Sequence, residues 1–303
     1  MIRRLMTTLA IIGLAAVRLR AADHHSVQGM LLSIDTAKHV ITVSCDPIPG
    51  YMEAMVMPFA VRDSAVLRDL HPGANVRFTT TEKAHQEYAE GIQVVAYANY
   101  EAEPTEAARL TFLHQAVAPQ SMEKAIPIGQ PVPDFTLTDQ QQNATHLEQF
   151  KGKVVALTFA YSRCPNPNYC FRLSNNLWRL SRRFHAAAGS DLVLLTIVIE
   201  PNNDRGKALD QYADTWKANP AAWHFLTGPL PEVRKVAELF GMHFWNDEGF
   251  LTHTFHTVVI DREGHLAANL EGNQFNADQL GDLVETVLRE PASKTLAGST
   301  SIH

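Results

Sequence analysis

The chain has 303 residues, of which 46% are hydrophobic, so it can bury a large core and has the length of about two ordinary domains. The formal net charge is −6 and lysine and arginine form no continuous basic stretch, which argues against nucleic acid as a partner. The chain has 3 cysteines, and two of them, Cys164 and Cys170, lie close together in the sequence. Cysteine chemistry is therefore confined to two places.

Residues 1–22 are typical of an export signal or a membrane anchor. A basic start precedes an apolar run over residues 5–17, which is short for a membrane span. Arginines near its end interrupt the usual cleavage pattern, so an uncleaved anchor stays open beside cleavage after Ala21 or Ala22. We expect the rest of the chain to be exported, either periplasmic or anchored to the outer face of the cytoplasmic membrane, where a cysteine pair can be oxidised.

Cleavage at either alanine would place a histidine, His24 or His25, third in the mature chain. A free amine, two backbone amides and an imidazole can form the square-planar site that Cu(II) favours. The plainer interpretation is a polar linker, and the sequence leaves both open.

Five short β-type segments between residues 26 and 100 predict a small all-β barrel of the OB type. Proline and glycine mark the turns between them, and a brief helical turn is expected over residues 65–70. The expected strands are 27–35, 39–45, 55–61, 76–81 and 91–100.

Residues 101–124 are rich in alanine and glutamate and are predicted to be a linker. Strands and helices then alternate through residues 125–290, which predicts an α/β core with a mostly parallel sheet, and residues 291–303 have the composition of a disordered tail. Gly264 predicts a terminal hairpin, and Asn276 is the expected N-cap of the last helix. The expected strands are 135–138, 153–161, 191–200, 224–226, 254–262 and 266–270; the expected helices are 171–187, 207–216, 232–240 and 277–289.

The segment Y-S-R-C-P-N-P-N-Y-C, residues 161–170, places Cys164 and Cys170 on a turn between a buried strand and a helix. Ordinary disulfide exchangers have two residues between their cysteines, whereas this loop has five and can open around a metal. Thiolates favour Cu(I), and the start of the helix is expected to lower the pKa of the thiol near it. On composition alone, a structural disulfide is the competing interpretation.

A nitrogen ligand is predicted at His253, in L-T-H-T-F-H-T-V-V-I-D. If the strand that follows runs antiparallel to its neighbours, it begins at the edge where they end, which is also where the cysteine turn emerges. His256 lies on the opposite face of that strand and is a weaker candidate.

These segments resemble the Sco/SenC family of copper-handling, thioredoxin-like proteins over residues 126–289. The matching motifs are residues 161–170, E-P-N-N-D at 200–204 and T-H-T-F-H-T-V-V-I-D at 252–261, with Glu200 standing where aspartate is usual and His256 where arginine is common. The resemblance implies that Cys164, Cys170 and His253 bind copper.

In the predicted barrel, Met55 and Met57 lie on one face of a strand because side chains alternate. Methionine commonly fills cores, so this spacing alone is weak evidence for a metal. The segment over residues 43–61 resembles the small periplasmic copper-binding barrels of the CusF type, however, and this implies that both methionines are Cu(I) ligands. Cys45 aligns with that family's histidine and would give a softer site.

The leading hypothesis is an exported copper chaperone that delivers copper to another copper protein, with the N-terminus allowing membrane proximity; the family resemblance indicates the oxidase subunit that carries the CuA site of cytochrome c oxidase. A thiol-disulfide oxidoreductase, with Cys164 and Cys170 as its redox pair, is the alternative, and copper storage or resistance is a third. The direction of transfer is left open.

Overall fold

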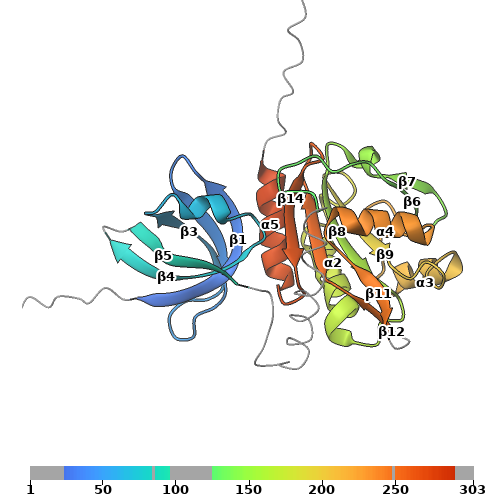
Figure 1. Cartoon of the computed structure of the whole chain (residues 1–303), viewed down its shortest axis with the longest axis horizontal. Coiled ribbons are helices and arrows are strands. Elements are labelled where there is room, and N and C mark those ends of the chain that lie inside the picture. The colour runs from blue at the N-terminus through green and yellow to red at the C-terminus, as the bar shows by residue number, and fades with distance from the viewer. Residues whose placement is uncertain (1–23, 84–85, 96–124, 248–249, 291–303) are drawn as a thin grey trace, which may run out of the picture.

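The computed structural model describes residues 24–83, 86–95, 125–247 and 250–290, which form a barrel and an α/β domain (Figure 1). The predictions for the leader, the linker over 101–124 and the C-terminal tail lie outside the described residues. No helix within the described ranges is both long and apolar enough to cross a membrane.

The N-terminal domain is a closed barrel with the strand order β1-β2-β3-β5-β4, which confirms the predicted small all-β barrel. Strands β3 and β5 pair in parallel only at Ala60 and Val61, so the first half of β3 is not paired with β5. The strands are β1 (His25–Asp35), β2 (Val40–Cys45), β3 (Met55–Val61), β4 (Asn75–Lys83) and β5 (Gln86–Val95), with the short helix η1 (Val66–Asp69) before β4.

The last barrel strand was expected to begin at Gly91, but β5 begins five residues earlier, at Gln86. Gly91 has a φ of 67° and lies where the register between β4 and β5 shifts. Glycine tolerates this conformation inside a bulged strand, so the residue marks an irregularity rather than a strand start.

The second domain has a five-stranded sheet in the order β10-β9-β8-β13-β14. Strands β8, β9 and β10 are parallel, whereas β13 runs antiparallel to β8 and forms the predicted hairpin with β14. Its main elements are β8 (Val154–Ala160), α2 (Arg172–Arg183), β9 (Leu192–Val198), α3 (Lys207–Thr215), β10 (Trp223–Leu226), α4 (Leu230–Leu239), β13 (His256–Ile260), β14 (Leu266–Glu271) and α5 (Ala277–Arg289).

Several short elements of this domain are absent from the sequence-based prediction. They are β7 (Ala144–His146), η2 (Leu147–Phe150), η3 (Pro167–Phe171), β11 (Phe244–Asp247) and β12 (Phe250–His253), whereas β6 (Thr136–Thr138) was predicted with a start one residue earlier. The continuous strand expected over residues 254–262 is wrong at its start, because Thr254 bonds to the backbone of His243 and β13 begins only at His256. The expected helix over 171–187 ends at Arg183.

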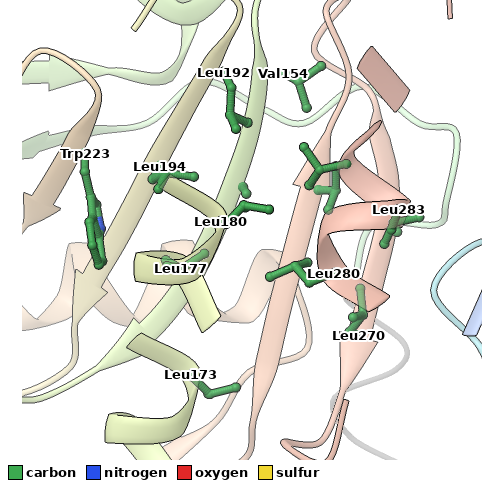
Figure 2. Close-up of a cluster of buried hydrophobic side chains, with 14 of the residues drawn as sticks. Val154, Leu173, Leu177, Leu180, Leu192, Leu194, Trp223, Leu270, Leu280 and Leu283 are labelled. Carbon is green, nitrogen blue, oxygen red and sulfur yellow. The ribbon is translucent and has the colours of Figure 1, made fainter. Parts of the chain in front are cut away.

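Apolar side chains cover both faces of the sheet. On one face, leucines of α2 and α5 meet Val154, Leu192 and Leu194 from the strands (Figure 2). On the other face, α4 and the β6–β7 region pack against alternate residues of the same strands. Every residue of β8 and β9 is buried, because both faces of these strands are covered. Strands buried on both faces have nearly continuous apolar sequences, and this explains the sequence pattern of β8 and β9.

Helix α5 lies between the barrel and the sheet (Figure 1). Met30 and Leu32, on the outer side of β1, belong to the same buried cluster as Leu280 and Leu283 of α5. Two hydrogen bonds flank this contact: Ser44 Oγ donates to Asp282 at 2.7 Å and Gln279 Nε2 donates to Asp46 at 2.9 Å. The two domains therefore share a continuous core.

This shared core predicts that a barrel mutation destabilises the other domain. Met30→Ala removes buried packing worth about 2–5 kcal/mol of unfolding free energy, so the urea midpoint should fall. Tryptophan fluorescence measures this cleanly because all 4 tryptophans lie beyond residue 125. Val94→Ala, at an exposed barrel position, is the control. An unchanged tryptophan transition in Met30→Ala would contradict the shared core.

Candidate functional site

The cysteine loop begins where β8 leaves the sheet. Ser162 is held there by Asp204, a fully buried carboxylate that accepts a 2.9 Å hydrogen bond from the Ser162 backbone N–H and a second from its hydroxyl. Arg163 forms an ion pair with Glu200 at 2.5 Å. Two side chains that follow β9 thus fix the two residues before Cys164.

The remainder of the loop is shaped by Asn166, whose side chain accepts a 2.9 Å hydrogen bond from the Asn168 N–H. Pro167 then opens the single turn η3, which is broken at Tyr169 and leads into α2. Cys170 in this turn is buried, whereas Cys164 is partly accessible, and both thiols are free. The loop therefore presents one accessible and one buried sulfur.

His253 reaches the cysteines from the end of β12, at the sheet edge where β8 ends, as the antiparallel direction of β13 predicted. Its Nε2 lies 3.7 Å from the Cys170 Sγ, and its Nδ1 lies 2.8 Å from the Thr254 carbonyl oxygen. Because a carbonyl only accepts, Nδ1 carries a proton, and Nε2 is the ring nitrogen that faces the sulfurs. The rings of Tyr161 and Phe255 pack edge-on against the imidazole.

The two thiols differ in acidity. A hydrogen bond from Cys170 is the main reason that the pKa of Cys164 falls from 9.0 to about 4. The same hydrogen bond, together with burial, raises the pKa of Cys170 well above its usual value. The proton thus stays on Cys170 and Cys164 is the thiolate, which corrects the expectation that the thiol nearest the helix start would be the acidic one.

Two sulfurs and one imidazole nitrogen therefore lie together. Donors that share an ion at about 2.3 Å for sulfur and about 2.0 Å for nitrogen are roughly 3.5–3.7 Å apart, so the separation of the Cys170 sulfur and the His253 nitrogen suits a common soft metal. Within the described ranges, no three His, Cys, Asp or Glu side chains already form a complete metal-holding group. The loop is accordingly a set of neighbouring donors rather than a closed coordination shell.

A groove of about 390 Å³ opens onto both sulfurs. Phe171, which is 59% exposed, forms one wall, and Tyr212 and Trp216 line the side nearest α3. A partner can therefore approach the thiols along an aromatic surface.

Some neighbouring residues lie outside this donor group or were not foreseen. His256 bonds to the Asn269 side chain at 2.9 Å, away from the cysteines.

Asp204 appears in the sequence analysis only as part of a motif, and its support of Ser162 depends on β9 lying beside β8. The sequence did contain a signal for this role of Asp204, which is an acidic residue shortly after a strand. The carboxyl ends of parallel strands share one sheet edge, so such a residue is expected near the cysteine loop.

The barrel brings its three predicted donors to one end of β2 and β3. Cys45 pairs with Met55, and Val43 pairs with Met57, so all three sulfur side chains share the inner face of the barrel. Cys45 is buried, Met57 is half-buried and Met55 is 49% exposed. Burial is the main reason that the pKa of Cys45 rises to about 12, so this thiol keeps its proton at neutral pH.

The acidity of Cys164 predicts how it reacts with iodoacetamide. Because the thiolate is the nucleophile, the alkylation rate should stay level from neutral pH down to about 5 and fall as pH drops through the pKa of about 4. Cys170→Ala removes the hydrogen bond that stabilises the thiolate and should move this fall to higher pH. Cys164→Ser retains only the buried thiols of Cys45 and Cys170 and therefore measures their background rate of alkylation. A rate that declines from pH 9 in the native chain would contradict the assignment.

Comparison with known proteins adds independent information. The model of the family described as SCO1/SenC matches residues 125–289, and that described as the copper binding periplasmic protein CusF matches residues 24–94. A SCO1 protein homolog of Bacillus subtilis is 26% identical over 102 residues, which cover 34% of this chain and 51% of that protein. A Stutzerimonas stutzeri protein described as copper-binding is 22% identical over 160 residues, which cover 51% of this chain and 76% of that protein.

Among solved structures, yeast Sco1 with copper bound has 22% identity and a TM-score of 0.44, covering 54% of this chain and 90% of that chain. The match to the Bacillus subtilis relative spans about half of that protein's length. The SCO1/SenC model covers more than half of this chain and the whole α/β domain, including the cysteine loop and His253. The chain therefore belongs to the SCO1/SenC family, with a thioredoxin-like domain preceded by a CusF-like barrel.

Proposed function

We propose that this chain is an exported copper chaperone that binds copper through Cys164, Cys170 and His253 and passes it to another protein. The observation that carries the proposal is the meeting of two sulfurs and an oriented imidazole at one sheet edge, with the Nε2 of His253 3.7 Å from the Cys170 sulfur. Soft sulfur ligands with one imidazole suit copper. Membership of the SCO1/SenC family supports the same function.

The chain's own groups prepare this site. Cys164 already offers a thiolate, and Cys170 gives up its shared proton when it binds the ion as a second thiolate. The Thr254 carbonyl holds the imidazole in the tautomer that can bind. The open groove beside the sulfurs leaves room for a partner's ligands to replace these donors one at a time.

The acceptor we propose is the CuA site of a terminal oxidase, which rests on the family resemblance. We base export on the apolar N-terminal residues 5–17. Export would place the protein in the compartment where it can meet such an acceptor. The barrel would hold Cu(I) at Cys45, Met55 and Met57 as a second site in the same chain, which the CusF match supports.

A thiol-disulfide oxidoreductase is the second candidate, and the acidity of Cys164 favours it. The Cys164 thiolate would attack an acceptor disulfide to form a mixed disulfide. Cys170 would then displace the acceptor thiol, leaving a Cys164–Cys170 disulfide and two reduced acceptor cysteines. Neither step requires His253.

Substitution of His253 separates the two functions. His253→Ala should weaken copper binding by at least about tenfold, because even outer-shell metal partners cost 10–100-fold when lost, and copper transfer to an isolated acceptor domain should fail while disulfide reduction continues. His256→Gln, which can keep a hydrogen bond to Asn269, is the control. Unimpaired metallation of the acceptor by His253→Ala would refute the copper-transfer mechanism.

Copper stoichiometry tests whether both domains bind the metal. The reduced full chain should hold about two copper ions if each soft-donor site takes one. Cys164→Ser/Cys170→Ser/His253→Ala and Cys45→Ser/Met55→Leu/Met57→Leu should each hold one, as measured by elemental analysis after desalting. The full chain is used because separation would expose Met30 and Leu32. A wild-type content of one ion, unchanged in the barrel variant, would remove the barrel from the proposal.

A further inference from the structure

The loop between β2 and β3 folds back over the open end of the barrel. Ile48 and Met52 form an isolated antiparallel bridge, with hydrogen bonds from Ile48 N to Met52 O at 2.7 Å and from Met52 N to Ile48 O at 3.0 Å. Gly50 makes this tight reversal possible with a φ of 77°. The position of Met52 is therefore fixed by backbone contacts.

Met52 returns to the end of the barrel that holds the other sulfurs. Both Met52 and Met57 pack against the buried cluster that contains Cys45. Gly29 pairs with Cys45 across the β1–β2 ladder, where an added Cβ would lie 2.2 Å from the Ser44 carbonyl oxygen and 2.8 Å from the Cys45 Cα, so the absence of a side chain lets the two backbones approach closely beside Cys45. The first half of β3 lacks pairing with β5, which leaves this end of the barrel open.

The distribution of methionine within the barrel is uneven. Its buried core cluster contains no methionine and is built from valine, leucine, isoleucine, alanine and phenylalanine around Cys45. Met30, the fully buried methionine of β1, belongs instead to the core shared with the second domain. Met52, Met55 and Met57 lie at or near the open end, and Met55 remains half exposed. Core filling explains Met30 well and this group poorly.

We propose that Met52 is a fourth sulfur donor of the barrel site, so that Cu(I) binds one thiolate, Cys45, and the three thioethers of Met52, Met55 and Met57. This inference rests on the proposed copper-binding function and deepens it. Cu(I) is soft and accepts four sulfur ligands in a tetrahedral arrangement. Thioethers add no charge, so one thiolate and one Cu(I) ion leave the site neutral.

Binding is a simple exchange at the cysteine. The Cys45 S–H bond breaks, a sulfur–copper bond forms and one proton is released to solvent, with no electron transferred. The thioethers bind through their lone pairs without losing a group. Asp46 is not a competing ligand, because its carboxylate accepts a hydrogen bond from Gln279 on the outer side of the barrel.

The experiment uses the reduced full chain in a Cys164→Ser/Cys170→Ser/His253→Ala background, which silences the other site. Cu(I) affinity is measured by competition with a chromophoric chelator, and the number of copper–sulfur bonds by X-ray absorption. Met52→Leu is the test variant and keeps the apolar volume. Met30→Leu is the matched control, because it is the barrel methionine that faces away from the site.

Met52→Leu should lower Cu(I) affinity by at least about tenfold, since loss of even a supporting metal partner costs that much, and should reduce the copper–sulfur coordination from four to three. Met30→Leu should change neither quantity. If Met55→Leu and Met57→Leu lower the affinity and Met52→Leu changes neither affinity nor sulfur count, Met52 is not a ligand and the three-sulfur barrel site survives. If none of the three substitutions has an effect, the barrel site itself is wrong.

Discussion

The packing of α5 against two surfaces is the constraint on which the arrangement of this protein depends. One side of the helix contributes Leu280 and Leu283 to the core of the thioredoxin-like domain, and the same buried cluster extends to Met30 and Leu32 of the barrel. An apolar contact of this kind resists domain separation, because opening it would expose buried side chains to water. The two candidate metal sites therefore belong to one connected body.

The start of α5 also contacts the surroundings of both sites. Gln279 donates to Asp46, the residue after Cys45, and accepts from the Asn276 backbone to complete the helix cap. A few residues earlier, Asn273 donates a 2.8 Å hydrogen bond to the Asn168 carbonyl inside the cysteine loop. One helix terminus thus supports the end of a barrel strand and the loop between the two redox-capable cysteines.

The two sites hold their thiols in opposite states, for electrostatic reasons. Cys164 is accessible and receives a hydrogen bond, so it is a thiolate, whereas Cys45 lies in an apolar barrel and stays protonated. A thiolate beside an open groove suits rapid exchange with a partner. A buried thiol surrounded by thioethers suits retention of a monovalent soft ion, since binding leaves no net charge in the apolar interior.

Local patterns in the sequence were sufficient for much of the fold. Asn276 and the apolar spacing after it predicted the full extent of α5, including its N-cap, because capping depends on residues only three apart. The buried runs of β8 and β9 were found for a similar reason. The sequence placed His253 near the cysteines on the condition that the strand after it runs antiparallel to its neighbours, and β13 does run antiparallel to β8.

Other features depended on contacts between distant residues, which the sequence by itself does not specify. The support of Ser162 by Asp204 and the burial of Met30 against α5 each join segments that lie at least 42 residues apart. The division of acidity between Cys164 and Cys170 is of the same kind, since it depends on burial and on which thiol donates the hydrogen bond. The sequence determined the donor residues and their chemical softness, whereas the tertiary structure decided which sulfur is ionised and how closely the imidazole approaches, because distance and desolvation exist only in the folded chain.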